Sequence, residues 1–551
     1  MKIKCVALIG FFYLTAVSNV LAQSTINIIP QPQELTIGKG FFTINSETEI
    51  LFMEDSKDAA ILLQDFIHKG LGSNLSTVLS KNQHSGSIIF KKNLKFDKEK
   101  YELQVSKNGI QIIAATKTGW FYGLQSLKQL FPASFGVSPL EATSIDIPEV
   151  VIKDVPRFSW RAFMLDEARY FKGMQQVKML LDEMARLKMN VFHWHLVDDQ
   201  GWRIEIKKYP LLTEIGSTRA STQIGPLHWD SPIQSAEPHS GFYTQNEIKE
   251  IVKYASERHI TVVPEIEMPG HATAAIASYS WLGTNKKEIE MPTKFGVSED
   301  VYDVSDPKVY QFLTDVLDEV MELFPSKVIH IGGDEVKYTH WKNSETVQAY
   351  MKENKLASPA ELQVFFTNRI SKYLESKGRN MMGWNEIMGH QLHTYQESED
   401  NNAALGQELA KGTVVHFWKG DIALLMEAAT NGYDIVNSLH TETYLDYDYK
   451  TIPLSKSYAF DPIPNNLDPK YHDKVIGTGC QMWGEWIPTN GEMHFLVFPR
   501  IAAYAEVGWT KKENKNFENF KLGLKGLQKY WGQRGIYYAP DSSTENVETE
   551  K

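Results

Sequence analysis

The sequence predicts an α/β fold, a (β/α)8 TIM barrel preceded by a small α+β domain with an antiparallel sheet. From about residue 157, eight short apolar segments alternate with helical stretches. Almost every one of these segments ends in an acid, a histidine or a large aromatic residue, as expected where the carboxyl ends of barrel strands form one face. A doubly wound open sheet is the alternative, but no glycine-rich nucleotide turn supports it.

The first 22 residues have the pattern of a secretory signal peptide. Residues 1–4 are basic, residues 6–20 are mostly apolar, and Ala22 precedes the expected cleavage point. A membrane anchor is the alternative, but the apolar run is short for a span and no second segment of spanning length follows. We therefore expect an exported protein, periplasmic or extracellular, without a membrane span after cleavage.

Composition narrows the class of partner. The 551 residues carry a net charge of −11, which gives no support for nucleic acid or an anionic membrane as partner. The 13 Trp and 24 Tyr are compatible with a neutral sugar substrate, because flat aromatic faces pack against sugar rings. Of the two cysteines, Cys5 lies in the leader, so Cys480 alone can form neither an internal disulfide nor a cysteine-based metal site.

Residues 23–150 are expected to form the small first domain. Residues 26–29 and 35–37 look like short strands. Residues 101–105 and 110–113 flank a turn with Gly109, which is a hairpin signal. Residues 117–131 have the apolar spacing of a helix. This domain carries no obvious chemistry.

Residues 151–510 are expected to form the barrel. The predicted strands are 162–166, 191–195, 261–265, 328–332, 380–384, 414–417, 434–437 and 475–482. Predicted helices between them are 174–187, 245–258, 308–323 and 360–377. The remaining residues, 511–551, are expected to hold a helix over 516–530 and a polar, disordered tail from residue 542.

Residues 330–335, with the sequence HIGGDE, are the most informative segment. Two glycines end a buried strand, and Asp334 and Glu335 stand at its exit. A charged pair is costly to desolvate there, so chemistry is a better explanation than stability. Neighbouring carboxylates repel, and one can be held protonated while the other stays ionised. Adjacent side chains on an extended chain point in opposite directions, so the loop has to re-aim one of them.

Other polar and aromatic residues follow the remaining strands. Going along the chain, they are Arg169, His193, His195, Asp198, Asp199, Glu265, Glu267, His271, Trp384, Glu386, Trp418, Tyr444, Asp446, Trp483, Glu485 and Trp486. Any one of these alone is unremarkable, since a lone Trp is more often core than ligand contact. Their recurrence on one face of a barrel is the signal.

Residues 156–202 and 330–335 closely resemble glycoside hydrolase family 20, the β-N-acetylhexosaminidases. The resemblance covers nearly the whole chain after the leader, including the small domain. It implies an exo-acting enzyme, without a metal or cofactor, that removes terminal non-reducing β-linked GlcNAc or GalNAc from glycans. It further implies a retaining mechanism in which the substrate's own acetamido oxygen attacks and forms an oxazolinium intermediate, an exception to ordinary two-carboxylate hydrolysis.

The resemblance also implies roles for individual residues. Glu335 matches the acid/base, Asp334 the group that orients the acetamido N–H, and Tyr444 the donor to the acetamido oxygen. The other matches are an aromatic box (Trp384, Trp418, Trp483), residues that grip sugar hydroxyls (Arg169, Asp446, Glu485), and a relay toward the acid/base (Asp198, His271). One position departs from the pattern: many relatives carry Asp where this chain has Glu267, which leaves the role of Glu267 in doubt.

Two other functions stay open. A metal-dependent hydrolase on the same barrel could use His193, His195, His271, His330 and Asp334. Against it, His193 and His195 are more simply core histidines bonded to their neighbours. A carbohydrate-binding protein without catalysis would keep the aromatic box and lose the acid pair, but Asp334 and Glu335 are both present.

Overall fold

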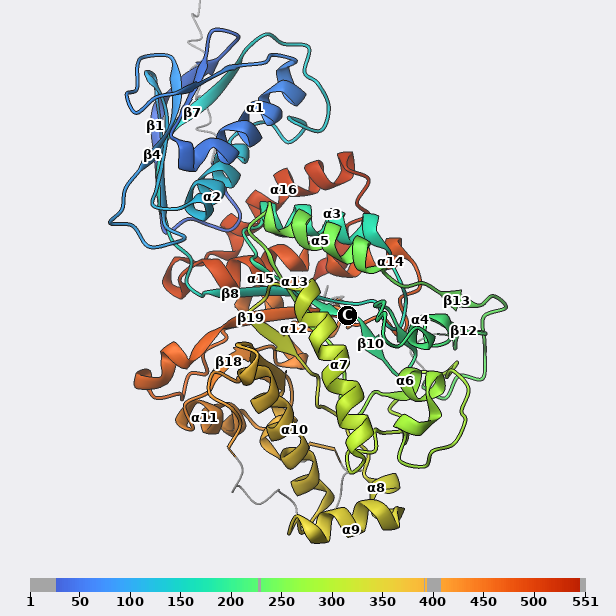
Figure 1. Cartoon of the computed structure of the whole chain (residues 1–551). Coiled ribbons are helices and arrows are strands. Elements are labelled where there is room, and N and C mark those ends of the chain that lie inside the picture. Colours follow the sequence, from blue (N-terminus) through green and yellow to red (C-terminus); the bar gives the residue numbers. More distant parts are fainter. Residues whose placement is uncertain (1–25, 226–228, 391, 394–407, 546–551) are drawn as a thin grey trace, which may run out of the picture.

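The computed structural model describes residues 26–225, 229–390, 392–393 and 408–545. The predicted signal peptide and residues 546–551 of the predicted disordered tail lie outside the described residues. The beginning of that tail is not disordered, because Asp541–Thr544 form a short helix in which Thr544 is buried. Two units are stacked in Figure 1, a smaller one in blue and a barrel below it. No described helix has the length and the apolar character that a membrane crossing requires.

The first unit is a seven-stranded sheet with two helices on one side of it (Figure 1). In chain order its elements are β1 (Glu34–Ile44), β2 (Glu49–Phe52), α1 (Lys57–Leu71), β3 (Ser76–Leu79), β4 (Ser87–Lys92), β5 (Tyr101–Ser106), β6 (Gly109–Ala114), α2 (Lys117–Lys128) and β7 (Ile145–Asp154). The expected hairpin is present as β5 and β6, and the expected helix as α2.

Two details of this domain differ from the expectation. The sheet is mixed rather than antiparallel, because β2 runs parallel to β3 and β4, and β4 runs parallel to β6. Helix α1 makes the long crossover that a parallel β2–β3 pair needs. Residues 26–29 form no strand, since the backbone of Ile29 exchanges both of its hydrogen bonds with the Gln129 side chain, at 2.9 and 2.6 Å.

The second unit is a closed barrel of eight parallel strands, as predicted. They are β8 (Trp160–Asp166), β9 (Val191–His195), β14 (Thr261–Glu265), β15 (Val328–His330), β16 (Asn380–Trp384), β17 (Val414–Phe417), β18 (Asp434–Asn437) and β19 (Val475–Met482). Strand β15 ends two residues before the predicted end, because Gly332 turns into a left-handed conformation. In the closed order β15 and β19 lie on opposite sides of the barrel.

Helices surround the barrel. The predicted ones are α3 (Met174–Arg186), α5 (Gln245–Ser256), α7 (Pro307–Leu323), α10 (Pro359–Ser376) and α16 (Phe517–Gln533). The rest are α4 (Leu211–Glu214), α6 (Thr273–Ser278), α8 (Thr339–Asn343), α9 (Glu345–Glu353), α11 (Ile422–Thr430), α12 (His440–Thr443), α13 (Leu454–Ala459), α14 (Asn490–Val497), α15 (Arg500–Trp509) and α17 (Asp541–Thr544). Short strand pairs β10 (Val197–Asp198) with β11 (Gly201–Trp202), and β12 (Thr218–Arg219) with β13 (His239–Ser240), lie in the connecting segments.

The inside of the barrel has two layers of different chemistry. One buried residue from each of seven strands forms an apolar layer, namely Ala162, Val191, Val263, Val328, Met382, Val414 and Val436. Beyond it, toward the carboxyl ends of the strands, lies a buried polar layer of His193, His195, Glu265, His330 and His416. The apolar layer fills the barrel as in other closed barrels, whereas the polar layer supports the face where the strand-end residues gather.

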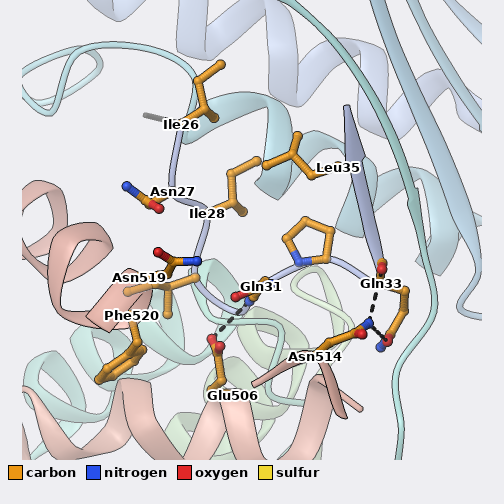
Figure 2. Close-up of a pocket in the computed structure, with 12 residues that line it drawn as sticks. Ile26, Asn27, Ile28, Gln31, Gln33, Leu35, Glu506, Asn514, Asn519 and Phe520 are labelled. Carbon is orange, nitrogen blue, oxygen red and sulfur yellow. Dashed lines mark hydrogen bonds between the residues drawn. The ribbon is translucent and has the colours of Figure 1, made fainter. Parts of the chain in front are cut away.

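The two units are joined by buried polar contacts. Asp154, at the end of β7, accepts hydrogen bonds from Tyr101 at 2.6 Å and from Trp509 of α15 at 3.0 Å, and Lys188 lies 3.2 Å away. A cavity of about 240 Å³ lies where residues 26–35 meet α15 and α16 (Figure 2). There the backbone N–H of Gln31 donates to Glu506 at 2.9 Å. Neither contact lies among the strand-end residues, so we regard this junction as structural.

Candidate active site

The strand ends surround an open cavity of about 580 Å³, within the usual size range of small-molecule sites. Ten of the eleven residues assigned from the sequence line it: Arg169, Asp198, His271, Asp334, Glu335, Trp418, Tyr444, Asp446, Trp483 and Glu485. The eleventh, Trp384, is only 1% exposed and packs in one cluster with Trp418 and Tyr444. The fold therefore brings all of the predicted residues together.

The glycines before the acid pair make its geometry possible. Gly332 and Gly333 have φ values of 64° and 90°, and Glu335 itself has φ 52°, a conformation that is uncommon for a residue with a side chain. A Cβ atom on Gly332 would lie 1.7 Å from Oε2 of Glu267. The loop is thus wound away from the extended geometry, which re-aims Glu335 as the sequence argument required.

His271 links the two carboxylates. Its Nε2 atom lies 3.8 Å from Oδ2 of Asp334 and 3.6 Å from Oε2 of Glu335. Burial, together with the nearby charges of Glu386 and Glu335, raises the pKa of Asp334 well above its ordinary value against the pull of His271. In the described part of the chain, Oδ1 of Asp334 is buried and accepts no hydrogen bond.

A second set of contacts continues from His271 to Arg169. His271 Nδ1 lies 3.2 Å from Oδ1 of Asp198 and 3.2 Å from Oδ2 of Asp199, and Asp198 Oδ2 lies 2.8 Å from Nη2 of Arg169. Burial alone would raise the pKa of Asp198, but Arg169 and His271 outweigh it and hold that pKa well below its ordinary value. Burial would lower the pKa of His271, yet Asp198 and Asp199 raise it well above its ordinary value. The connection expected between Asp198, His271 and the acid pair is therefore present.

Aromatic rings form one side of the cavity. Trp418 and Tyr444 lie almost parallel, with ring centroids 6.2 Å apart and an interplanar angle of 6°. Trp384 and Trp483 are 6.0 Å apart and complete the cluster. The indole N–H of Trp384 donates to Glu265 at 2.8 Å, and that of Trp418 donates to Glu386 at 3.0 Å. These bonds fix the two rings, so the cluster is a rigid apolar wall.

The end of the cavity opposite the acid pair is lined by polar side chains. Glu485 follows β19, and its Oε1 lies 3.8 Å from Nη1 of Arg169, which follows the adjacent strand β8. Burial and the charge of Glu485 raise the pKa of Asp446 well above its ordinary value. Within the described chain, Oδ1 of Asp446 is buried and makes no hydrogen bond. Carboxylates and a guanidinium at this end can bind hydroxyl groups.

Glu267 is buried beneath the acid pair. Among the described residues neither of its oxygens forms a hydrogen bond, and its Oε1 lies 4.0 Å from Nδ1 of His195. Burial and the charges of Asp334 and Glu265 raise the pKa of Glu267 well above its ordinary value. The longer side chain at this position is accommodated by Gly332.

Sequence reasoning left several residues in or beside the cavity without a role. Trp229 is 55% exposed and meets Trp486 edge-on at 5.7 Å, on the side of β19. His393 Nε2 lies 3.6 Å from Oε1 of Glu335 and 3.5 Å from Oε1 of Glu386. Glu386 and Trp486 were recognisable as strand-end residues. Trp229 and His393 stand in long connections with no pattern that would have identified them.

The histidines of the metal-site alternative contact carboxylates. His193 Nε2 lies 2.9 Å from Glu265 Oε2, and His195 forms hydrogen bonds with Glu265 at 2.7 Å and Asp198 at 2.9 Å. These are the neighbour contacts expected of core histidines. His271, Asp334 and Glu335 also have donor atoms close enough together to hold a cation. A chelator experiment therefore belongs in any functional test.

Two family profiles match the chain. The profile described as "Glycosyl hydrolase family 20, catalytic domain" matches residues 158–512, and that described as "Glycosyl hydrolase family 20, domain 2" matches residues 25–155. The chain belongs to glycoside hydrolase family 20. The two profiles correspond to the barrel and to the mixed-sheet domain described above.

Several proteins are similar to this chain over most of its length. A beta-hexosaminidase of Porphyromonas gingivalis is 37% identical to this chain over 93% of this chain's residues. The matched region spans 64% of that relative's own length. A beta-hexosaminidase of Vibrio furnissii is 33% identical over 89% of the chain and 77% of its own length. Among solved structures, a family 20 exo-β-N-acetylglucosaminidase from Vibrio harveyi in complex with N-acetylglucosamine has a TM-score of 0.78 and 30% identity, covering 93% of this chain and 78% of its own. The β-N-acetylhexosaminidase of Bacteroides fragilis has a TM-score of 0.77 and 29% identity, covering 93% of this chain and 97% of its own.

Proposed function

We propose that the protein is an exo-acting β-N-acetylhexosaminidase that releases terminal non-reducing GlcNAc or GalNAc from glycans. The observation that carries the proposal is the position of Asp334 and Glu335, two carboxylates joined through His271 in a cavity walled by Trp418 and Tyr444. Family membership and the names of the relatives support the same activity.

In the proposed reaction the acetamido oxygen of the substrate attacks the anomeric carbon, and the retained configuration follows from a second attack by water. Glu335 protonates the leaving oxygen and later removes a proton from water. Asp334 accepts the acetamido N–H through Oδ1, which has no other partner in the described chain. Burial favours the protonated form of Asp334. The positive charge that develops on the acetamido nitrogen favours the ionised carboxylate instead, and so lowers the pKa of Asp334.

The remaining groups hold the sugar. Tyr444 donates to the acetamido oxygen and keeps it close to the anomeric carbon. Trp384, Trp418 and Trp483 surround the acetamido methyl group and the ring. Arg169, Asp446 and Glu485 bind the hydroxyls at the far end, opposite β15. A substrate oriented in this way presents its anomeric bond to Glu335.

Participation of the acetamido group is tested with substrates in which its methyl carries none, one, two or three fluorine atoms. Fluorine withdraws electron density from the carbonyl oxygen, so kcat/KM should fall steeply along the series. A nearly flat series would contradict substrate assistance and favour a carboxylate nucleophile.

The division of roles is tested with Glu335→Gln and Asp334→Asn. We expect Glu335→Gln to lose about 100-fold or more on substrates with poor leaving groups and distinctly less on dinitrophenyl substrates, which need little protonation. Asp334→Asn should lose activity whatever the leaving group is. Equal losses for both variants on every leaving group would refute the assignment.

We further propose export of the protein, because residues 1–22 have the pattern of a signal peptide. Sequencing the N-terminus of the protein made in its own cells tests this. The expected first residue is Gln23. A mature protein that still begins at Met1 would contradict export by cleavage.

A further inference from the structure

Glu265 lies at the centre of the barrel, below the cavity, and has no role in the reaction described above. Its side chain is fully buried. Oε2 lies 2.7 Å from His195 Nδ1 and 2.9 Å from His193 Nε2. Oε1 lies 3.0 Å from His330 Nδ1 and accepts the indole N–H of Trp384 at 2.8 Å. A single carboxylate therefore contacts groups from three different strands.

The charges around Glu265 are set by these contacts. Burial alone would raise its pKa, but His330, His195 and His193 hold that pKa well below the ordinary value. Burial would likewise lower the pKa of His195, yet Glu265 and Asp198 raise it to about 10. At neutral pH Glu265 is thus an anion and His195 a cation, a pairing that a buried ion requires.

The contacts continue without a break to the proposed acid/base. His195 Nε2 lies 2.9 Å from Asp198 Oδ2, and Asp198 Oδ1 lies 3.2 Å from His271 Nδ1. His271 Nε2 in turn lies 3.6 Å from Glu335 Oε2. Negative and positive groups alternate along this path, so each one stabilises the charge of the next.

We infer that Glu265 is a positioning residue for Glu335, because the relay extends from Asp198 through His195 to the centre of the barrel. The same carboxylate holds the Trp384 indole, so it also fixes one wall of the aromatic box. This inference rests on the proposed function, since it assigns Glu265 to the reaction of that site. If Glu265 only neutralised the buried imidazoles, replacing it would leave acid catalysis by Glu335 unaffected.

A double-mutant cycle with Glu265→Gln and Asp198→Asn tests the relay. The readout is kcat/KM on the 4-methoxyphenyl and 2,4-dinitrophenyl N-acetyl-β-glucosaminides, because only the methoxyphenyl leaving group depends strongly on protonation. We expect Glu265→Gln to lose about 10-fold or more on the first substrate and about 3-fold or less on the second. Members of one relay act as a unit, so the double variant should lose little more than Asp198→Asn alone.

His193→Gln is the matched control. It alters a buried histidine that touches the same carboxylate but stands off the path, so the ratio of the two substrates should keep its wild-type value. If Glu265→Gln does not fold, His195→Gln interrupts the path at the next residue and takes its place in the cycle.

Two results overturn the inference. One is an equal loss on both substrates, and the other is a double variant whose loss is the product of the two single losses. Failure of the proposed function is distinguishable, because the unmodified protein would then hydrolyse neither substrate.

Discussion

Glu506 provides a quantitative prediction about how stability depends on pH. It stands on α15 at the junction with the first domain, where it accepts a hydrogen bond from Gln31 N–H at 2.9 Å (Figure 2). It also accepts one from the Tyr458 hydroxyl at 3.4 Å. Burial raises its pKa from 4.5 to about 7, although Gln31 and Lys515 act in the opposite direction. The folded protein therefore binds a proton here that the unfolded chain releases above its own pKa of about 4.3.

The sign of the effect follows from proton binding. Where the folded state holds more protons than the unfolded state, the free energy of unfolding decreases as pH rises. For Glu506 this loss begins near the unfolded pKa and is complete once pH exceeds about 7. Each unit between the two pKa values corresponds to about 1.36 kcal/mol, so the total is about 3 to 4 kcal/mol, of which about 1 kcal/mol is lost below about pH 5 and about 2 to 3 kcal/mol between about pH 5 and pH 8.

Glu506→Gln replaces the carboxyl with a neutral group of the same shape, which removes this titration. We expect the variant to be more stable than the wild type by about 1 kcal/mol at about pH 5 and by about 3 to 4 kcal/mol at about pH 8. Urea unfolding of both proteins at the two pH values measures the difference. Glu513→Gln, at an exposed position nearby, is the control and should change neither value. A stability difference that stays constant with pH, or that favours the wild type at high pH, would refute the reasoning.

The other predictions concern the site. Gly332→Ala places a methyl group on the Glu267 carboxylate and a side chain at φ 64°, so we expect a loss of at least about 1–2 kcal/mol in urea unfolding together with reduced kcat/KM. Unchanged stability would contradict the packing described for Gly332. Tyr444→Phe removes one donor to the acetamido oxygen and should lower kcat about 100-fold, as measured on a nitrophenyl substrate; retention of full activity would remove Tyr444 from the mechanism. Trp229→Ala, at a half-exposed position on the cavity wall, should raise KM while changing stability by less than about 0.5 kcal/mol, and unchanged KM would show that Trp229 does not touch the substrate.

Periodicity was sufficient to predict the barrel. Strands such as Val191–His195 and Thr261–Glu265 begin and end where the sequence indicates, because buried parallel strands are short apolar runs between clear helical patterns. The first domain was predicted less completely. Nothing local distinguishes parallel from antiparallel neighbours, so the pairing of β2 with β3 and β4 could not be anticipated. Ile29 was misassigned because the partner of its backbone is a side chain 100 residues away.

The candidate site was predictable to the extent that its residues follow strands. Trp418 stands directly after its strand, and Asp334 and Glu335 follow β15 within five residues. Barrel closure alone brings such positions together. The contacts among them were not predictable, since they depend on loop geometry. The left-handed backbone at Glu335 and the central position of Glu265 result from tertiary packing, for which the sequence has no local signal.

The most direct test of the central claim is release of nitrophenol from p-nitrophenyl N-acetyl-β-glucosaminide by the purified mature protein in excess EDTA, alongside the corresponding β-glucoside. We predict rapid release from the N-acetyl substrate and almost none from the glucoside, which lacks the acetamido nucleophile. Activity that appears only after zinc is added would instead support the metal-dependent hydrolase. No release from the N-acetyl substrate under either condition would contradict the proposed activity.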